Sequence, residues 1–164
     1  MRKTIYSVTN FLHCGNDYLF IHRINRSNKV DGGRLNGIGG KLEPGENFLQ
    51  TAIRETIEET GYQVTVKDVK LAGMVRMQGG YSDDWMMSFF KIEVPTQEIP
   101  LGNKNAEGEL IWLPAEKVLT SGYELVDDLH YCFNDIVKDN IPFMAHAQMT
   151  KEEKVRTWNV SYLK

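Results

Sequence analysis

One stretch constrains the fold more than any other: residues 40–62, with the sequence GKLEPGENFLQTAIRETIEETGY. It predicts a tight loop followed by a helix, because residues 48–60 contain neither glycine nor proline. Asn47 suits the N-cap position, and Gln50 stands three residues later, as in a capping box. Gly61 stands where a left-handed residue commonly ends a helix. The local pattern therefore predicts both ends of this helix.

Helical spacing divides the predicted helix into two faces. At about 100° per residue, three carboxylates fall within an arc of roughly 100°: Glu55, Glu58 and Glu59. Three apolar residues point the other way and are expected to pack on a core: Leu49, Ile53 and Ile57. Like charges this close repel one another. Arg54 is placed to offset one charge through an i,i+4 pair with Glu58, and Lys41 is a candidate to offset another.

The remaining negative charge has two interpretations. An acidic helix face is commonly only a solvated surface. A hard divalent cation such as Mg²⁺ would instead stabilise the carboxylates, because it prefers oxygen ligands and keeps waters and substrate phosphates around it. A metal held in this way suits phosphoryl chemistry, since it neutralises phosphate charge and activates water.

The spacing resembles the pattern of the Nudix hydrolases, G-x5-E-x7-R-E-U-x-E-E-x-G-U, in which U is a bulky apolar residue. This chain supplies the following positions of the pattern: Gly40, Glu46, Arg54, Glu55, Glu58, Glu59, Gly61 and Tyr62. It departs from the pattern at Thr56, which stands at an apolar position. We expect the Thr56 methyl group to face the core, with a small packing cost and with metal binding intact.

The resemblance implies an α/β fold, the Nudix α/β/α sandwich, in which helices flank a mixed central sheet; we expect a C-terminal β-hairpin in addition. We expect one domain over residues 1–164, a usual length for a single domain. Apolar and β-branched runs predict strands at 3–12, 18–23, 63–66, 69–77, 85–94, 110–114, 142–149 and 154–162. Further helices are expected at 114–119 and 129–137, and a loop at 25–33.

The same resemblance implies Mg²⁺ or Mn²⁺ as the cofactor. The implied ligands are the three helix carboxylates and the Gly40 carbonyl oxygen: Gly40, Glu55, Glu58 and Glu59. Arg54 would orient these carboxylates through a salt bridge, and Glu46 would act similarly at the loop.

Many Nudix enzymes also recruit a glutamate from the loop before a strand that ends like Trp112-Leu-Pro114. The spacing favours Glu107 over Glu109 for this role, which would be a metal ligand or the general base; the alternative is a solvated acid. Either Glu55 or Glu107 would then be the base, and the sequence leaves this choice open.

Candidate substrate contacts lie on both sides of the loop at 25–33. Arg23 would form either a structural salt bridge or a phosphate contact. Asn36 occupies a position that touches the base in Nudix enzymes acting on oxidised purine nucleotides; otherwise it bonds to the turn backbone. Lys41 is a candidate for stabilising the leaving phosphate. By contrast, the apolar residues of the strand at 85–94 are expected in the core: Met86, Met87 and Phe89.

Asp127 and Asp128 precede the helix expected at 129–137. Acidic residues are favoured at a helix start by the helix dipole, so the pair would serve as N-terminal caps. The pair also resembles the Asp-Asp that oxidised-purine triphosphatases use for base recognition. A carboxylate accepts a hydrogen bond from a purine N–H, and a protonated one also donates.

The resemblance thus implies a MutT-type hydrolase of nucleoside triphosphates. The expected substrate is an (oxidised) purine nucleotide such as 8-oxo-dGTP, with a nucleoside monophosphate and pyrophosphate as products. A nucleoside-diphosphate-sugar or dinucleotide pyrophosphatase is the alternative within the enzyme class. A nucleotide-sensing module without catalysis is the alternative from another class.

Composition excludes several other roles. The net charge is −3, whereas a protein that grips long nucleic acid usually has a basic excess. No apolar stretch approaches the roughly 20 residues that span a bilayer, and the N-terminus does not read as a signal peptide. We therefore expect a cytoplasmic monomer or homodimer. Cys14 and Cys132 lie far apart and outside any metal-like spacing, so both are expected to be reduced thiols.

Overall fold

The computed structural model describes residues 1–24, 32–138 and 141–163. Its strands are β1 Thr4–Cys14, β2 Asp17–Arg23, β3 Leu35–Asn36, β4 Ile38–Lys41, β5 Val69–Gly79, β6 Asp84–Glu93, β7 Gly108–Pro114, β8 Phe143–Met149 and β9 Val155–Tyr162. Its helices are α1 Phe48–Thr60 and α2 Leu129–Val137, with 3₁₀ helices η1 Val66–Asp68 and η2 Ala115–Thr120. Most of the loop expected at 25–33 lies outside the described residues.

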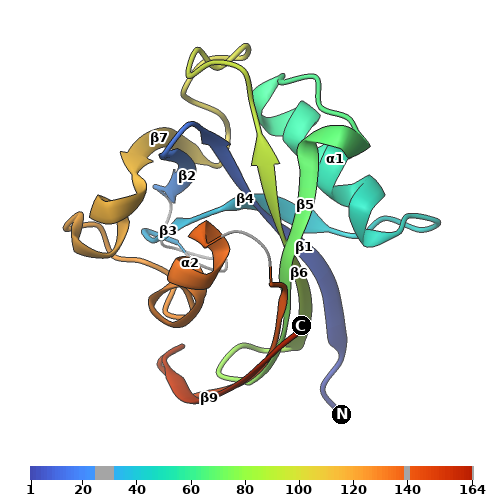
Figure 1. Ribbon diagram of the computed structural model, residues 1–164. Coiled ribbons are helices and arrows are strands. Elements are labelled where there is room, and N and C mark those ends of the chain that lie inside the picture. Colours follow the sequence, from blue (N-terminus) through green and yellow to red (C-terminus); the bar gives the residue numbers. More distant parts are fainter. Residues whose placement is uncertain (25–31, 139–140, 164) are drawn as a thin grey trace.

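A mixed sheet separates α1 on one face from α2 on the other (Figure 1). Within the described ranges the strand order is β3-β2-β1-β6-β5-β8-β9, with β4 paired to β1 and β7 paired to β2. β1 runs parallel to β6 and antiparallel to β2 and β4. The expected α/β/α sandwich and the C-terminal hairpin, formed by β8 and β9, are both confirmed.

Alternation along β1 and β2 builds two cores, because successive side chains of a strand point to opposite faces. Phe11 and Phe20 are fully buried on the α2 side, where they pack against Phe133. Leu12 and Leu19 are fully buried on the α1 side. The sheet therefore anchors both helices, and it fixes where the loop before α1 meets the sheet.

Both predicted ends of α1 are confirmed. The Asn47 side chain accepts from the Gln50 backbone N–H at 2.9 Å, and the Gln50 side chain accepts from the Asn47 N–H at 2.9 Å. Gly61 is left-handed with φ of 80°. A Cβ at Gly61 would also crowd Pro100 and Leu101, so both the left-handed φ and the lack of space favour glycine there.

The predicted core face of α1 is confirmed only in part. The helix buries its small residues against the sheet: Thr51, Ala52, Thr56 and Thr60. The apolar residues expected there are half-buried, and Ile53 among them packs against the core: Leu49, Ile53 and Ile57. Small side chains let the helix lie close to β1, where Asn10 contacts Ala52 and Thr56.

A buried polar contact explains why threonine is tolerated at position 56. Asn10 is fully buried, and its Nδ2 donates to the Ala52 carbonyl at 2.9 Å and to Thr56 Oγ1 at 3.1 Å. Thr56 Oγ1 in turn donates to the Ala52 carbonyl at 2.8 Å. Thr56 is fully buried, and hydrogen bonds satisfy its hydroxyl beneath the helix, at a position where the Nudix pattern has an apolar residue.

Four segments differ from the predicted secondary structure. β3 and β4 were not predicted, and they form because residues 35–36 pair with β2 and residues 38–41 pair with β1. Residues 63–66 form no strand; Thr65 instead caps η1, and its N–H donates to Asp68 Oδ2 at 2.8 Å. This local capping box competes successfully with strand pairing. The helix expected at 114–119 is present as the 3₁₀ helix η2. The other strands, and the helix at 129–137, agree with the predictions to within a few residues at their ends.

Candidate active site

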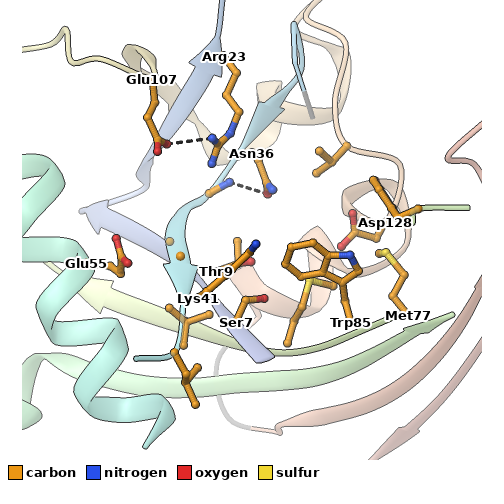
Figure 2. A pocket seen from close by; sticks show the side chains of 18 of the residues that line it. Ser7, Thr9, Arg23, Asn36, Lys41, Glu55, Met77, Trp85, Glu107 and Asp128 are labelled. Atoms are coloured by element: carbon orange, nitrogen blue, oxygen red, sulfur yellow. Dashed lines mark hydrogen bonds and ion pairs between the residues drawn. The ribbon is translucent and has the colours of Figure 1, made fainter. Parts of the chain in front are cut away.

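A cavity of about 560 Å³ lies between the sheet, the loop before α1 and the segment before α2. Its size is typical of small-ligand sites. Figure 2 shows charged side chains at one end: Arg23, Glu55 and Glu107. The other end is largely apolar and contains one carboxylate: Met77, Trp85 and Asp128. Asn36, Thr9 and Lys41 lie between them. The two ends differ in the chemistry that they offer a ligand.

Arg54 connects the loop before α1 to the carboxylates of the helix. Its Nε and Nη2 donate to the two oxygens of Glu46 at 2.6 and 3.0 Å. Its Nη1 donates to Glu55 Oε1 at 3.0 Å and to Glu58 Oε2 at 3.2 Å. Nη2 also donates to the Lys41 carbonyl at 3.2 Å. One guanidinium therefore fixes two glutamates of α1 relative to the loop.

Glu46 accepts additional hydrogen bonds that favour its charged form. Its carboxylate accepts from Thr51 Oγ1 at 2.7 Å and from the Glu43 N–H at 3.2 Å. The hydrogen bonds from Arg54, and then the one from Thr51, lower the pKa of Glu46 to about 2. The carboxylate is therefore ionised at neutral pH and holds Arg54 in place.

Gly40 lies directly against the Glu55 carboxylate. A Cβ at position 40 would collide with Glu55 Oε1, so a larger residue there would displace the end of the Glu55 side chain. Glu55 is largely buried, and burial raises its pKa in spite of the nearby Arg54. Of the three helix glutamates, Glu55 is the one that lines the cavity.

Glu58 and Glu59 lie outside the cavity lining. Glu58 is exposed next to Arg54. Glu59 is turned inward, and its Oε2 is buried without a hydrogen-bond partner among the described residues. Burial, and then the negative charges of Glu107 and Glu55, raise the pKa of Glu59 to about 9. Without a cation nearby, this carboxyl group is therefore neutral at pH 7.

Glu107 reaches the cavity from the loop before β7. Its Oε2 accepts from Arg23 Nη1 at 2.9 Å. The Asn105 side chain shapes this loop by accepting from the N–H groups of Glu107 and Gly108 at 2.9 and 3.1 Å. Glu109 pairs with His22 within the sheet and does not line the cavity.

Arg23 forms the structural salt bridge that was one of the two interpretations considered for it. It forms the ion pair with Glu107, and it lines the cavity. Its Nε is a buried donor that no described residue satisfies. A buried donor without a partner is costly, so this nitrogen is suited to bind an anionic ligand or a water.

Between the two ends, Asn36 and Lys41 each make a contact within the protein. Asn36 Oδ1 accepts from the Gly37 N–H at 2.8 Å, the turn contact considered as its alternative role. Lys41 Nζ lies 5.7 Å from the Trp85 ring centroid, a cation–π distance. Lys41 therefore points toward the aromatic end of the cavity.

The two aspartates before α2 diverge. Asp128 is 5% exposed and faces the cavity, as Figure 2 shows. It occupies the N-cap position of α2, but its side chain makes no capping hydrogen bond. Asp127 Oδ2 accepts instead from the Val155 N–H at 2.7 Å, outside the cavity lining. Neither carboxylate therefore caps the helix.

A family model described as the NUDIX domain matches residues 5–130. The chain belongs to the Nudix family. It is a Nudix hydrolase, a pyrophosphohydrolase that acts on acid anhydrides, and the family implies a nucleotide-type substrate. None of the helices that the structure describes has the length and apolar character needed to span a bilayer.

Solved structures share the Nudix fold. The MutT protein from Bacillus halodurans has a TM-score of 0.75 at 23% identity, over 96% of this chain and 97% of its own. The MutT protein from Methanosarcina mazei Go1 has a TM-score of 0.64 at 22% identity, over 82% and 91%. The NUDIX domain of Shewanella oneidensis NrtR, solved with ADP-ribose, has a TM-score of 0.62 at 17% identity, over 82% and 87%. At these identities the likeness shows the fold alone.

Nudix hydrolases typically use divalent metals, and the charged end of this cavity fits one. Glu55 and Glu107 in the lining, and Glu59 next to them, offer only oxygen atoms, which Mg²⁺ and Mn²⁺ prefer. The unpaired Glu59 Oε2 and the mutual repulsion of the three carboxylates are both relieved by a cation. Among the described residues, no three His, Cys, Asp or Glu side chains are already arranged as a metal cluster.

Sequence reasoning missed the aromatic and thioether end of the Nudix cavity. Trp85 and Met87 line it, and both are half-buried; Met87 packs against the core, as expected, and also faces the cavity. Phe89, on the same face of β6, is buried as expected. The period-two pattern placed these three side chains on one face. It did not show that the face opens to a cavity toward the start of β6.

Proposed function

We propose that this chain hydrolyses purine nucleoside triphosphates, including oxidised ones such as 8-oxo-dGTP, in the cytoplasmic nucleotide pool. The products would be a nucleoside monophosphate and pyrophosphate. The observation that supports the proposal is the two-ended cavity, with Glu55 and Glu107 at one end and Asp128 beside Trp85 at the other. A nucleotide has the same division between its charged phosphates and its flat, hydrogen-bonding base.

At the charged end, we propose that Glu55, Glu58, Glu59 and Glu107, with the Gly40 carbonyl, hold Mg²⁺ or Mn²⁺. When bound, the cation would neutralise phosphate charge and lower the pKa of an attacking water. Glu55 or Glu107 would accept the proton of that water. Arg23 would donate to phosphate oxygens, and Arg54, held by Glu46, would keep Glu55 in position.

At the other end, the base would lie against Trp85 and Met87, while Asp128 accepts a hydrogen bond from a purine N–H. Asn36 would contribute its amide group beside Asp128. Lys41 lies next to Trp85, between the two ends, where it would stabilise a phosphate or add to the stacking surface.

A nucleotide panel with product identification tests this proposal. The protein is incubated with Mg²⁺ and with dGTP, 8-oxo-dGTP, dATP, dCTP, a sugar nucleotide and ADP-ribose. We expect the purine triphosphates to react fastest and to release pyrophosphate. Fast cleavage of ADP-ribose or of the sugar nucleotide without triphosphate turnover would replace the proposal with a diphosphate-linked substrate. Tight binding with no turnover of any compound would indicate a sensing role.

A further inference from the structure

The neighbours Asp127 and Asp128 make different kinds of contact. Asp128 lines the cavity and is 5% exposed. Asp127 Oδ2 accepts from the Val155 backbone N–H at 2.7 Å, and its Oδ1 lies 3.6 Å from Lys154 Nζ. The Asp127 carboxylate therefore binds the start of β9, which lies 28 residues further along the chain.

The start of β9 is fixed by other contacts as well. In the turn between β8 and β9, the Thr150 N–H donates to the Lys154 carbonyl at 2.8 Å. Glu153 in this turn has a positive φ of 60° and pairs with Arg34 Nη1 at 2.7 Å. The turn and the first residue of β9 are therefore bonded both to Asp127 and to Arg34, the residue before β3.

The segment that carries both aspartates is also held from its other side. The Leu35 N–H donates to the Glu124 carbonyl at 2.7 Å, and the Val126 N–H donates to the Leu35 carbonyl at 3.1 Å. Leu35 immediately precedes Asn36. The segment at 124–128 is thus held between β3, beside Asn36, and the first residue of β9.

We infer that Asp127 is a positioning residue: its hydrogen bond to Val155 sets where the Asp128 carboxylate lies in the base end of the cavity. This inference rests on the proposed function, because it takes that end to be where a purine base binds. Of the Asp-Asp pair, only Asp128 then touches the base. Asp127 acts through the backbone that the two residues share.

Three variants separate this role from direct contact with the base. Asp127→Asn keeps an oxygen that accepts from Val155 N–H but loses the charge opposite Lys154. Asp127→Ala loses both interactions. Lys154→Met removes the ammonium group, and we expect it to have little effect, because the pair is 3.6 Å apart and Lys154 is 52% exposed at its side chain.

The first measurement is calorimetric binding of GMP and AMP to the full chain. We expect Asp127→Ala to weaken GMP binding about tenfold, equivalent to about 1.4 kcal/mol, with Asp127→Asn and Lys154→Met within about twofold of the unmodified protein. The ratio of GMP to AMP affinity should stay unchanged in Asp127→Asn. It should change in Asp128→Asn.

The second measurement is hydrogen exchange of the Val155 amide in the ligand-free protein. Protection should fall in Asp127→Ala and persist in Asp127→Asn. Equal losses of GMP affinity in the two Asp127 variants, or an altered GMP to AMP ratio in Asp127→Asn, would mean that Asp127 contacts the base. Unchanged GMP binding in Asp127→Ala would remove the positioning role.

These measurements do not depend on hydrolysis. If the protein binds GMP but cleaves no triphosphate, the proposed reaction is wrong while the role of Asp127 is still decided by the three variants. If the unmodified protein binds neither nucleotide, the base end is misassigned and the inference is overturned with it.

Discussion

The guanidinium of Arg54 engages both oxygens of Glu46, at 2.6 and 3.0 Å, and so ties the loop before α1 to the helix eight residues further along. The same side chain reaches Glu55 with its remaining nitrogen at 3.0 Å. The position of the Glu55 carboxylate in the cavity therefore depends on the ionisation of Glu46, which lies outside the cavity lining.

Glu46→Gln should change how stability depends on acid. The folded pKa of Glu46, about 2, lies below its ordinary value of 4.5. Its stabilising effect is therefore complete above about pH 4.5 and is lost as the pH falls toward 2. In urea denaturation with EDTA, Glu46→Gln should be much less stable than the unmodified protein at pH 7, and the gap should shrink below pH 4.5. Glu43→Gln, 3.8 Å from Arg54, is the matched control. A difference in stability that stays the same at every pH would contradict the lowered pKa of Glu46.

In metal-free protein, the effect of Glu59→Gln on stability should depend on pH in the opposite direction to that of Glu46→Gln. The folded pKa of Glu59, about 9, lies above its ordinary value of 4.5. Folding therefore becomes less favourable as the pH rises between these values, by at most about 1.4 kcal/mol per pH unit. Glutamine cannot ionise, so the advantage of Glu59→Gln over the unmodified protein in urea denaturation should grow from pH 5 to pH 8.

Added Mg²⁺ extends this test. It should stabilise the unmodified protein at pH 8 and have less effect on Glu59→Gln, since the variant offers no carboxylate to the cation. If the stability of Glu59→Gln and that of the unmodified protein changed with pH in the same way, Glu59 would not be a buried carboxylate whose charge is unbalanced.

Glu107 and Glu109 provide a second matched pair. Glu107 lines the cavity, whereas Glu109 is paired within the sheet. We expect Glu107→Gln to lower kcat by about 10²- to 10⁴-fold, the range for a lost general base. Glu109→Gln should stay within about twofold of the unmodified enzyme on the same scale. Steady-state kinetics at saturating Mg²⁺ measure both values; similar losses in the two variants would argue against a catalytic role for Glu107.

Trp85→Ala should weaken nucleotide binding more than it slows the reaction. Stacking of a base on an aromatic ring contributes about 1–3 kcal/mol, so KM for a purine triphosphate should rise about tenfold or more. Trp85→Phe keeps a ring beside Lys41 and should restore most of the affinity. The separation of KM from kcat is the measurement; an unchanged KM in Trp85→Ala would place the base elsewhere.

Contacts between near neighbours in the chain could be predicted from the sequence. The Asn47–Gln50 box and the Gly61 cap of α1 are decided within a few residues, and both were predicted correctly. The Arg54–Glu58 pair also follows from helical spacing alone, and the structure contains it at 3.2 Å. The Nudix fold was predictable for the same reason, since its characteristic pattern lies within residues 40–62.

Contacts over long separations could not be predicted. The buried face of α1 depends on Asn10, which lies 46 residues before Thr56. Asp127 turns away from the cavity that Asp128 faces because its carboxylate accepts from the backbone N–H of Val155. In each case the sequence near the residue was compatible with two outcomes, and a partner from a distant strand selected one of them.

The contact between Asn10 and Thr56 has a consequence for how this chain tolerates change. A leucine at position 56 alone would press an aliphatic group onto a buried amide and remove its hydroxyl partner. A leucine at position 10 alone would strip the threonine of a donor. The two sites are therefore expected to vary as a unit, from one polar pair to one apolar pair, and an engineer who alters either strand β1 or helix α1 must redesign both together.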